Sequence, residues 1–125
     1  MRIRFMPLVM GLALALAAHA ADVSGKWKSE FESQIGAQKY TFEFKVEGQK
    51  LTGKASFERA GQKGDVELKE GRVSGDEIFF VETANFQGNE LRIEYKGKIA
   101  GDELTLTRKV GELASYQIVA KRVKD

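Results

Sequence analysis

Apolar and polar residues alternate with a period of two over most of the chain beyond its first twenty residues. The segments 40–46, 91–96 and 104–107 carry an aliphatic or aromatic residue at every second position, with Thr, Glu, Lys or Arg between them. Successive side chains of a β-strand point to opposite faces, so such strands have one apolar and one charged face. Helical spacing is nowhere sustained. The pattern therefore predicts antiparallel sheet that is buried on one side only.

Turn residues divide this pattern into about eight strands, which predicts one all-β domain. The strands are expected at residues 24–33, 39–47, 50–58, 65–74, 77–84, 89–99, 103–110 and 115–123. Their succession is typical of a single antiparallel up-and-down meander. In the fourth strand the apolar face shifts from Val66 and Leu68 to Val73, which predicts a β-bulge near Gly71.

Three predicted hairpins have two-residue turns that begin with glycine, namely Gly48-Gln49, Gly75-Asp76 and Gly101-Asp102. Glycine at the first turn position suits a type II′ turn, where φ is positive. The segments 71–78 and 97–104 are also similar to each other, which indicates a duplicated hairpin. Along a meander, successive connections alternate between the two ends. The tight turns therefore lie at one end and the longer connections at the other, which suggests a cup.

The first twenty residues are expected to be a cleaved secretory signal peptide. Arg2 and Arg4 precede an apolar run that is shorter than the roughly 20 residues of a spanning helix. Ala18-His19-Ala20 then offers the small residues of a signal peptidase site. The alternative is a membrane-anchored N-terminus. We favour cleavage, which would leave a β-barrel domain at residues 21–125, exported to the periplasm or beyond the cell and not inserted in a membrane.

Removal of this segment changes what the composition allows. Arg2 and Arg4 account for the whole formal charge of +2, so the remaining domain is about neutral and gives no electrostatic case for nucleic acid. The only His, the only Pro and all three Met also lie in the segment, and the chain has no Cys. These absences exclude His- or Cys-based nucleophiles, thiolate or imidazole zinc sites and disulfides. We therefore expect no metal, no cofactor and no enzyme activity. The alternative left open is carboxylate, Lys or Tyr chemistry, for which Glu82 is the one candidate base.

A Gly-x-Trp motif opens the first predicted strand as Gly25-Lys26-Trp27, and Arg122 lies near the end of the last strand. With these residues the chain resembles the calycin group, which comprises lipocalins, fatty-acid-binding proteins and avidin-like barrels. The resemblance implies a lipocalin-like closed barrel in which Arg122 packs over Trp27 at the closed end. The chain has no sign of the helix that follows the lipocalin strands, nor of the helical lid of fatty-acid-binding proteins.

Two charged residues are expected inside the barrel. Glu82 and Arg108 occupy equivalent positions after two of the tight turns, in line with the inward aliphatic residues of their strands. They could form a buried ion pair, or turn to solvent at the rim. Alternatively, they could bind the polar head of a ligand in a pocket formed with other inward aromatic residues. That hypothetical ligand site comprises Tyr40, Phe42, Phe44, Phe57, Phe80, Glu82, Tyr95, Arg108 and Tyr116.

The favoured function is the binding of a small, apolar molecule inside the barrel. The alternative is a protein-interaction or inhibitor module that captures a secreted partner with its open-end loops. Phe86 lies in one of these loops, at residues 85–89, where it could plug the barrel, contact a ligand or anchor a partner protein.

Overall fold

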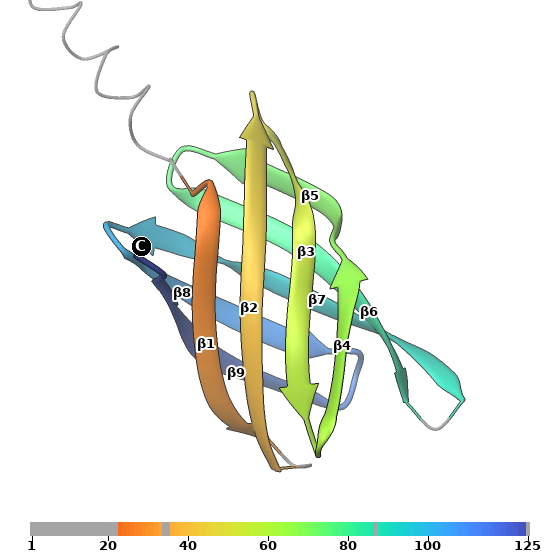
Figure 1. Ribbon diagram of the computed structural model, residues 1–125. Helices are drawn as coiled ribbons and strands as arrows, with labels where there is room; N and C mark the ends of the chain where they lie inside the picture. Colours follow the sequence, from red (N-terminus) through yellow and green to blue (C-terminus); the bar gives the residue numbers. More distant parts are fainter. Residues whose placement is uncertain (1–22, 34–35, 87, 125) are drawn as a thin grey trace, which may run out of the picture.

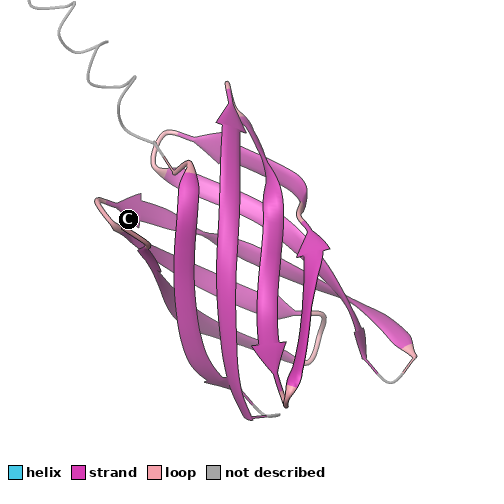
Figure 2. Cartoon of the chain, in the orientation of Figure 1, coloured by secondary structure: helices cyan, strands magenta, loops and turns pink. Residues whose placement is uncertain are grey.

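The computed structural model describes residues 23–33, 36–86 and 88–124, except for the side chain of Phe86. The predicted signal peptide lies outside this part. The described chain is built from strands and turns (Figure 2), and none of it forms a helix with the length and hydrophobicity of a membrane span. The strands are β1 (Gly25–Ser33), β2 (Gly36–Glu47), β3 (Lys50–Arg59), β4 (Gln62–Glu67), β5 (Lys69–Ser74), β6 (Glu77–Phe86), β7 (Asn89–Ala100), β8 (Glu103–Val110) and β9 (Ala114–Arg122).

The strands close into an antiparallel barrel, as the alternation predicted. Each of β5 to β8 pairs with the next strand, β9 pairs with β1, β1 with β2, and β2 with β3. The ring closes where β3 meets β5, at the pair Lys50 and Arg72. In Figure 1, β1 to β4 form the front wall and cross over β6 to β9 behind them. Closure satisfies the backbone groups that an open sheet would leave at its edges.

The predicted fourth strand is divided into two, which makes nine strands in the described chain. β4 pairs with the loop-end half of β3, whereas β5 turns away from β4 to pair with β6. The register of β5 shifts between Lys69 and Arg72, and Glu70 has a positive φ of 55°. Gly71 is required there, because a Cβ atom would lie 2.1 Å from the Leu51 carbonyl oxygen. The bulge predicted near Gly71 is thus confirmed as the point where the wall bends.

The two ends of the barrel differ as the order of turns predicted. The pairs Glu47–Lys50, Ser74–Glu77 and Ala100–Glu103 close two-residue hairpins at one end. The glycine at the first position of each turn has φ between 61° and 63°, whereas the second turn residue does not have a positive φ. This combination is typical of the type II′ turn. The connections β1–β2, β3–β4, β6–β7 and β8–β9 lie at the opposite end (Figure 1). We call this opposite end the mouth.

Trp27 closes the barrel at the tight-turn end. Its side chain is fully buried, and its Nε1 donates a hydrogen bond of 2.9 Å to the Val23 carbonyl oxygen. Arg122 is its cross-strand neighbour on β9, and the guanidinium lies 4.4 Å from the indole ring centre. The same guanidinium contacts Asp102 at 2.9 Å and the Ser24 carbonyl oxygen at 3.0 Å. The predicted packing of Arg122 over Trp27 at the closed end is confirmed.

Replacement of Arg122 tests this closure. The Arg122→Ala variant is expected to lower the free energy of unfolding by about 1–2 kcal/mol, because a partly buried cation–π stack and its hydrogen bonds are lost together. Urea denaturation measures the difference. Lys121→Ala is the matched control, since Lys121 is an exposed cation on the same strand and also pairs with β1. Equal effects of the two substitutions would contradict a specific role for Arg122.

Candidate ligand-binding site

A cavity of about 360 Å³ opens at the mouth of the barrel. Polar side chains form its floor, and small and aliphatic side chains from strands on opposite sides of the barrel form its walls. The described residues that line it are Ser33, Gln38, Arg59, Ala60, Gln62, Ala84, Asn85, Leu91, Ile93, Arg108, Val110, Leu113, Ala114 and Tyr116. The volume lies within the usual range of small-molecule pockets.

Below this cavity lies a buried carboxylate, that of Glu82 on β6, which is 0% exposed. The hydroxyl of Tyr40 donates a hydrogen bond to its Oε2 at 2.8 Å, and the hydroxyl of Tyr95 donates to its Oε1 at 2.7 Å. Arg59 is its cationic partner, with Nη1 3.5 Å from Oε2. A buried carboxylate is costly unless it is paired and hydrogen-bonded, and here both of its oxygens have partners.

Arg108 joins this network through tyrosines. Its Nε donates to the Tyr95 hydroxyl at 2.9 Å, its Nη2 to the Tyr40 hydroxyl at 3.2 Å, and its Nη1 to the Tyr116 hydroxyl. The registers explain this arrangement, since Tyr95, Arg108 and Tyr116 are cross-strand neighbours on β7, β8 and β9. The predicted inward position of Glu82 and Arg108 is confirmed. The direct ion pair that was one of the alternatives is wrong, because two phenols lie between the charged groups.

The burial of these tyrosines changes their acidity. The pKa of Tyr40 is raised to about 12, because burial disfavours the phenolate and the charge of Glu82 repels it. Burial, and then Glu82, also raise the pKa of Tyr95 well above its ordinary value. Both phenols therefore stay protonated at neutral pH and remain hydrogen-bond donors to the carboxylate.

The predicted site residues fall into two groups. Arg108 and Tyr116 line the cavity, whereas Tyr40, Tyr95 and Glu82 form the network beneath it. Phe42, Phe44 and Phe80 lie deeper and pack against one another, with ring centres 5.2–5.8 Å apart. Phe57 packs on Tyr40 and lies under the Arg59 guanidinium at 3.9 Å. The tight-turn half of the barrel is thus filled with aromatic rings. Contact of these residues with a ligand stays a prediction.

Sequence reasoning missed Arg59 and Gln38, which both line the cavity. The signal was present in the alternation. Gln38 precedes Tyr40, Phe42 and Phe44 at the same two-residue spacing, and Arg59 follows Ala55 and Phe57 in the same way. The apolar walls formed by Leu91, Ile93, Val110 and Leu113 were missed as well. Phe86 ends β6 beside the mouth, but its side chain lies outside the described part of the structure, so its predicted role stays a prediction.

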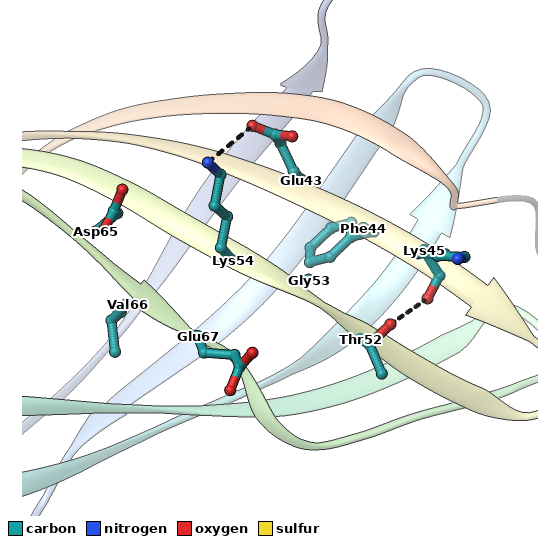
Figure 3. Close-up of a pocket in the computed structure, with 9 residues that line it drawn as sticks. All are labelled: Glu43, Phe44, Lys45, Thr52, Gly53, Lys54, Asp65, Val66 and Glu67. Atoms are coloured by element: carbon teal, nitrogen blue, oxygen red, sulfur yellow. Dashed lines mark hydrogen bonds and ion pairs between the residues drawn. The ribbon is translucent and has the colours of Figure 1, made fainter.

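A second hollow, of about 550 Å³, lies where β3 leaves β4 (Figure 3). It is larger, but its polar side chains belong mainly to the outward faces of β2, β3 and β4, and the Lys54–Glu43 contact in it is 4.0 Å long. Exposed ion pairs of this kind contribute little. Gly53 permits the bend, since a Cβ there would lie 1.8 Å from the Glu43 carbonyl oxygen. We therefore assign the candidate site to the mouth cavity, where buried polar groups converge.

The described residues offer little for metal or acid–base chemistry. No group of three His, Cys, Asp or Glu side chains within them comes together in a way that could hold a metal ion. Glu82, the carboxylate that sequence reasoning weighed as a base, is engaged by two phenols and does not line the cavity. The arrangement is suited to holding a molecule by hydrogen bonds and apolar contact.

No protein-family model and no curated protein matches the chain. Among solved structures, it is similar to a mutant of the fluorescent protein UnaG, with 15% sequence identity and a TM-score of 0.46. The match covers 82% of this chain and 97% of that one. The fold is an all-β, closed antiparallel up-and-down barrel. That assignment rests on the strand pairing itself, and the similarity gives no information on what the cavity binds.

The tyrosine network predicts a loss of stability in alkali. The pKa of Tyr40 in the folded protein lies above the value near 10 of an unfolded chain. The stability that the protonated phenol contributes is therefore fully present below pH 10 and is lost as pH rises through about 12. Through the ionisation of Tyr40 alone, the rise in pH across this interval should lower the free energy of unfolding by roughly 3 kcal/mol. Urea denaturation between pH 9 and 12 measures the slope, with Tyr40→Phe for comparison. Identical slopes in the two proteins would contradict this reading.

Proposed function

We propose that this protein is exported and binds a small amphipathic carboxylate in the mouth cavity. The observation that carries the proposal is the charge of the lining. Arg59 and Arg108 both line the cavity, whereas no Asp or Glu is among the described residues that do so. Arginine donates in a planar fork that matches a carboxylate, so this floor favours an anionic head group.

The charges of the buried network support the same conclusion. Glu82 supplies one negative charge against the two positive charges of Arg59 and Arg108. The phenols of Tyr40 and Tyr95 are neutral at pH 7. One cation is therefore left over at the base of the cavity. A ligand carboxylate would balance it in a place that is largely withdrawn from water, where an uncompensated charge is costly.

Donor groups for such a ligand are already in place. Within the described residues, Arg59 donates only through Nη1, to Tyr40, which leaves its Nε and Nη2 groups for a ligand. The Arg59 side chain is 17% exposed, so it is reachable from the cavity while its stack on Phe57 fixes its plane. The hydroxyl of Tyr116 accepts a bond from Arg108 and retains its own proton to donate.

The remaining walls define the other part of the ligand. Leu91, Ile93 and Val110 give an apolar surface above the floor, and Leu113 stands at the rim with 66% of its surface exposed. A volume of 360 Å³ lies near the lower end of the roughly 300–1,000 Å³ that small-molecule pockets span. The cavity is thus suited to a compact, ring-sized apolar body and not to a long acyl chain.

Calorimetric titration of the purified protein with 2-naphthoate and with its neutral analogue 2-naphthamide tests this proposal. We expect the carboxylate to bind and the amide to bind at least 10-fold more weakly. Arg59→Met should weaken naphthoate binding about 10- to 100-fold, the effect of losing charge-assisted hydrogen bonds, and should leave the amide little changed.

Arg72→Met is the matched control, because Arg72 also stacks on a phenylalanine, Phe79 at 4.3 Å, but does not line the cavity. Thermal denaturation of each variant checks that the barrel is intact. Equal binding of the carboxylate and the amide, or no effect of Arg59→Met beyond that of Arg72→Met, would sink the assignment of an anionic ligand.

Export is supported by the sequence of the first twenty residues alone. Expression of the full chain in a Gram-negative bacterium, followed by cell fractionation and intact mass measurement, is expected to yield a periplasmic or secreted product that begins at Ala21. Replacement of Ala20 by a bulky residue, as in Ala20→Phe, should cause the uncleaved chain to accumulate, because signal peptidase requires a small residue there. A cytosolic product of full mass from the unaltered chain would refute the export proposal.

A further inference from the structure

We propose that the ligand carries an N–H or O–H donor next to its carboxylate, and that Gln38 selects for this donor. The inference deepens the proposed function and rests on it. Gln38 is positioned on β2, where it lines the mouth cavity, and the residue is buried, with 3% of its surface exposed. Its carbonyl oxygen, Oε1, is the one buried polar side-chain atom of the described residues that makes no hydrogen bond.

The orientation of this amide is determined by its neighbours. The Ser33 hydroxyl donates its proton to the Gly36 carbonyl oxygen at 3.0 Å, so it accepts a hydrogen bond from the amide that faces it at 2.7 Å. An amide nitrogen can donate there, whereas an amide oxygen cannot. The nitrogen of Gln38 therefore faces Ser33, and Oε1 is held away from it as an acceptor.

A buried acceptor without a partner destabilises a protein by about 1–3 kcal/mol. An apolar residue of similar size, such as Met or Leu, would avoid this cost at the same inward position. On the inward face of β2, Gln38 lies between Tyr40 and the start of the strand. Tyr40 contacts Glu82, whereas Gln38 Oε1 makes no hydrogen bond, so the Glu82 network is complete without this acceptor. It is suited to receive a donor from the ligand.

The sheet register places this acceptor beside the cation. Gln38 on β2 and Arg59 on β3 are direct cross-strand partners, and both line the cavity. The Cβ atoms of such a pair lie about 4.5–5.5 Å apart. A ligand whose carboxylate is held by Arg59 would thus have the Gln38 side chain beside it, on the neighbouring strand. The ligand class is therefore a carboxylate with a neighbouring donor, such as a 2-hydroxy acid, an N-acyl amino acid or a heteroaromatic acid with a ring N–H.

An isosteric pair of probes isolates the donor. Indole-2-carboxylate has a ring N–H next to its carboxylate, and benzofuran-2-carboxylate has a ring oxygen in the same place and nearly the same shape. We expect the unaltered protein to bind the indole about 3- to 10-fold more tightly by calorimetry, the value of one hydrogen bond. Gln38→Met should remove the preference by weakening the indole while leaving the benzofuran unchanged or tighter.

Gln38→Glu keeps an acceptor oxygen at the same place and adds a negative charge. It should weaken both probes but preserve the preference for the indole, and it serves if the Met variant proves unstable. Binding of both probes with equal affinity would refute the role of Gln38 while leaving the anionic site standing. A preference that persists in Gln38→Met would refute it as well. Failure of both probes to bind the unaltered protein would overturn the proposed function, and this inference with it.

Discussion

The position of one carboxylate, Glu82, inside the barrel governs how the rest of the interior is arranged. A charge at that depth has to be paired and hydrogen-bonded, and its own strand supplies neither partner. Tyr40 from β2, Tyr95 from β7 and Arg59 from β3 converge on it from around the barrel. Because Tyr40 and Arg59 belong to the β2–β3 hairpin and Glu82 to the β6–β7 hairpin, the network forms only when the barrel brings the two hairpins together in register.

The same network separates two halves of the interior with different uses. Toward the tight turns, the rings of Phe42, Phe44 and Phe80 fill the space and Trp27 seals the end. Toward the loops, small and aliphatic residues replace the rings and leave the cavity open. The aromatic packing thus lies below the network and the candidate binding cavity above it, while Arg59 and Arg108 belong to both the network and the cavity lining. A substitution of an apolar lining residue such as Leu91 or Val110 leaves the network and the aromatic core in place, whereas loss of Arg59 also removes the cationic partner of Glu82.

Much of this fold could be predicted from the sequence, because a two-residue alternation determines which side chains face inward. It placed Glu82 and Arg108 inside at equal height, and the order of turns placed Trp27 and Arg122 at the closed end. The partners of Glu82 were harder to predict. A tyrosine and an arginine compete for the same carboxylate, and the outcome depends on side-chain reach across the barrel, which sequence spacing does not contain.

The size of the cavity was beyond prediction for a related reason. Whether the inward aromatic and aliphatic side chains fill a barrel depends on its radius, and that radius depends on where the wall bends. Gly53 and Gly71 allow close backbone approaches at the branch between β4 and β5. The sizes of the side chains in the sequence do not reveal this bend of the backbone. Arg59 and Gln38 obey the same alternation as the aromatic residues, but their significance becomes visible only once the space beside them is known.

The balance of charge in the mouth explains why an occupant there should be an anion and not simply an apolar molecule. Two guanidinium groups and one carboxylate leave an excess cation in a partly dehydrated site, and Tyr40 and Tyr95 cannot compensate it because their raised pKa values keep them neutral. An apolar ligand would remove water from Arg59 without replacing its hydrogen bonds, which costs free energy. A carboxylate replaces them, so the apolar walls can then contribute to affinity without opposition from the floor.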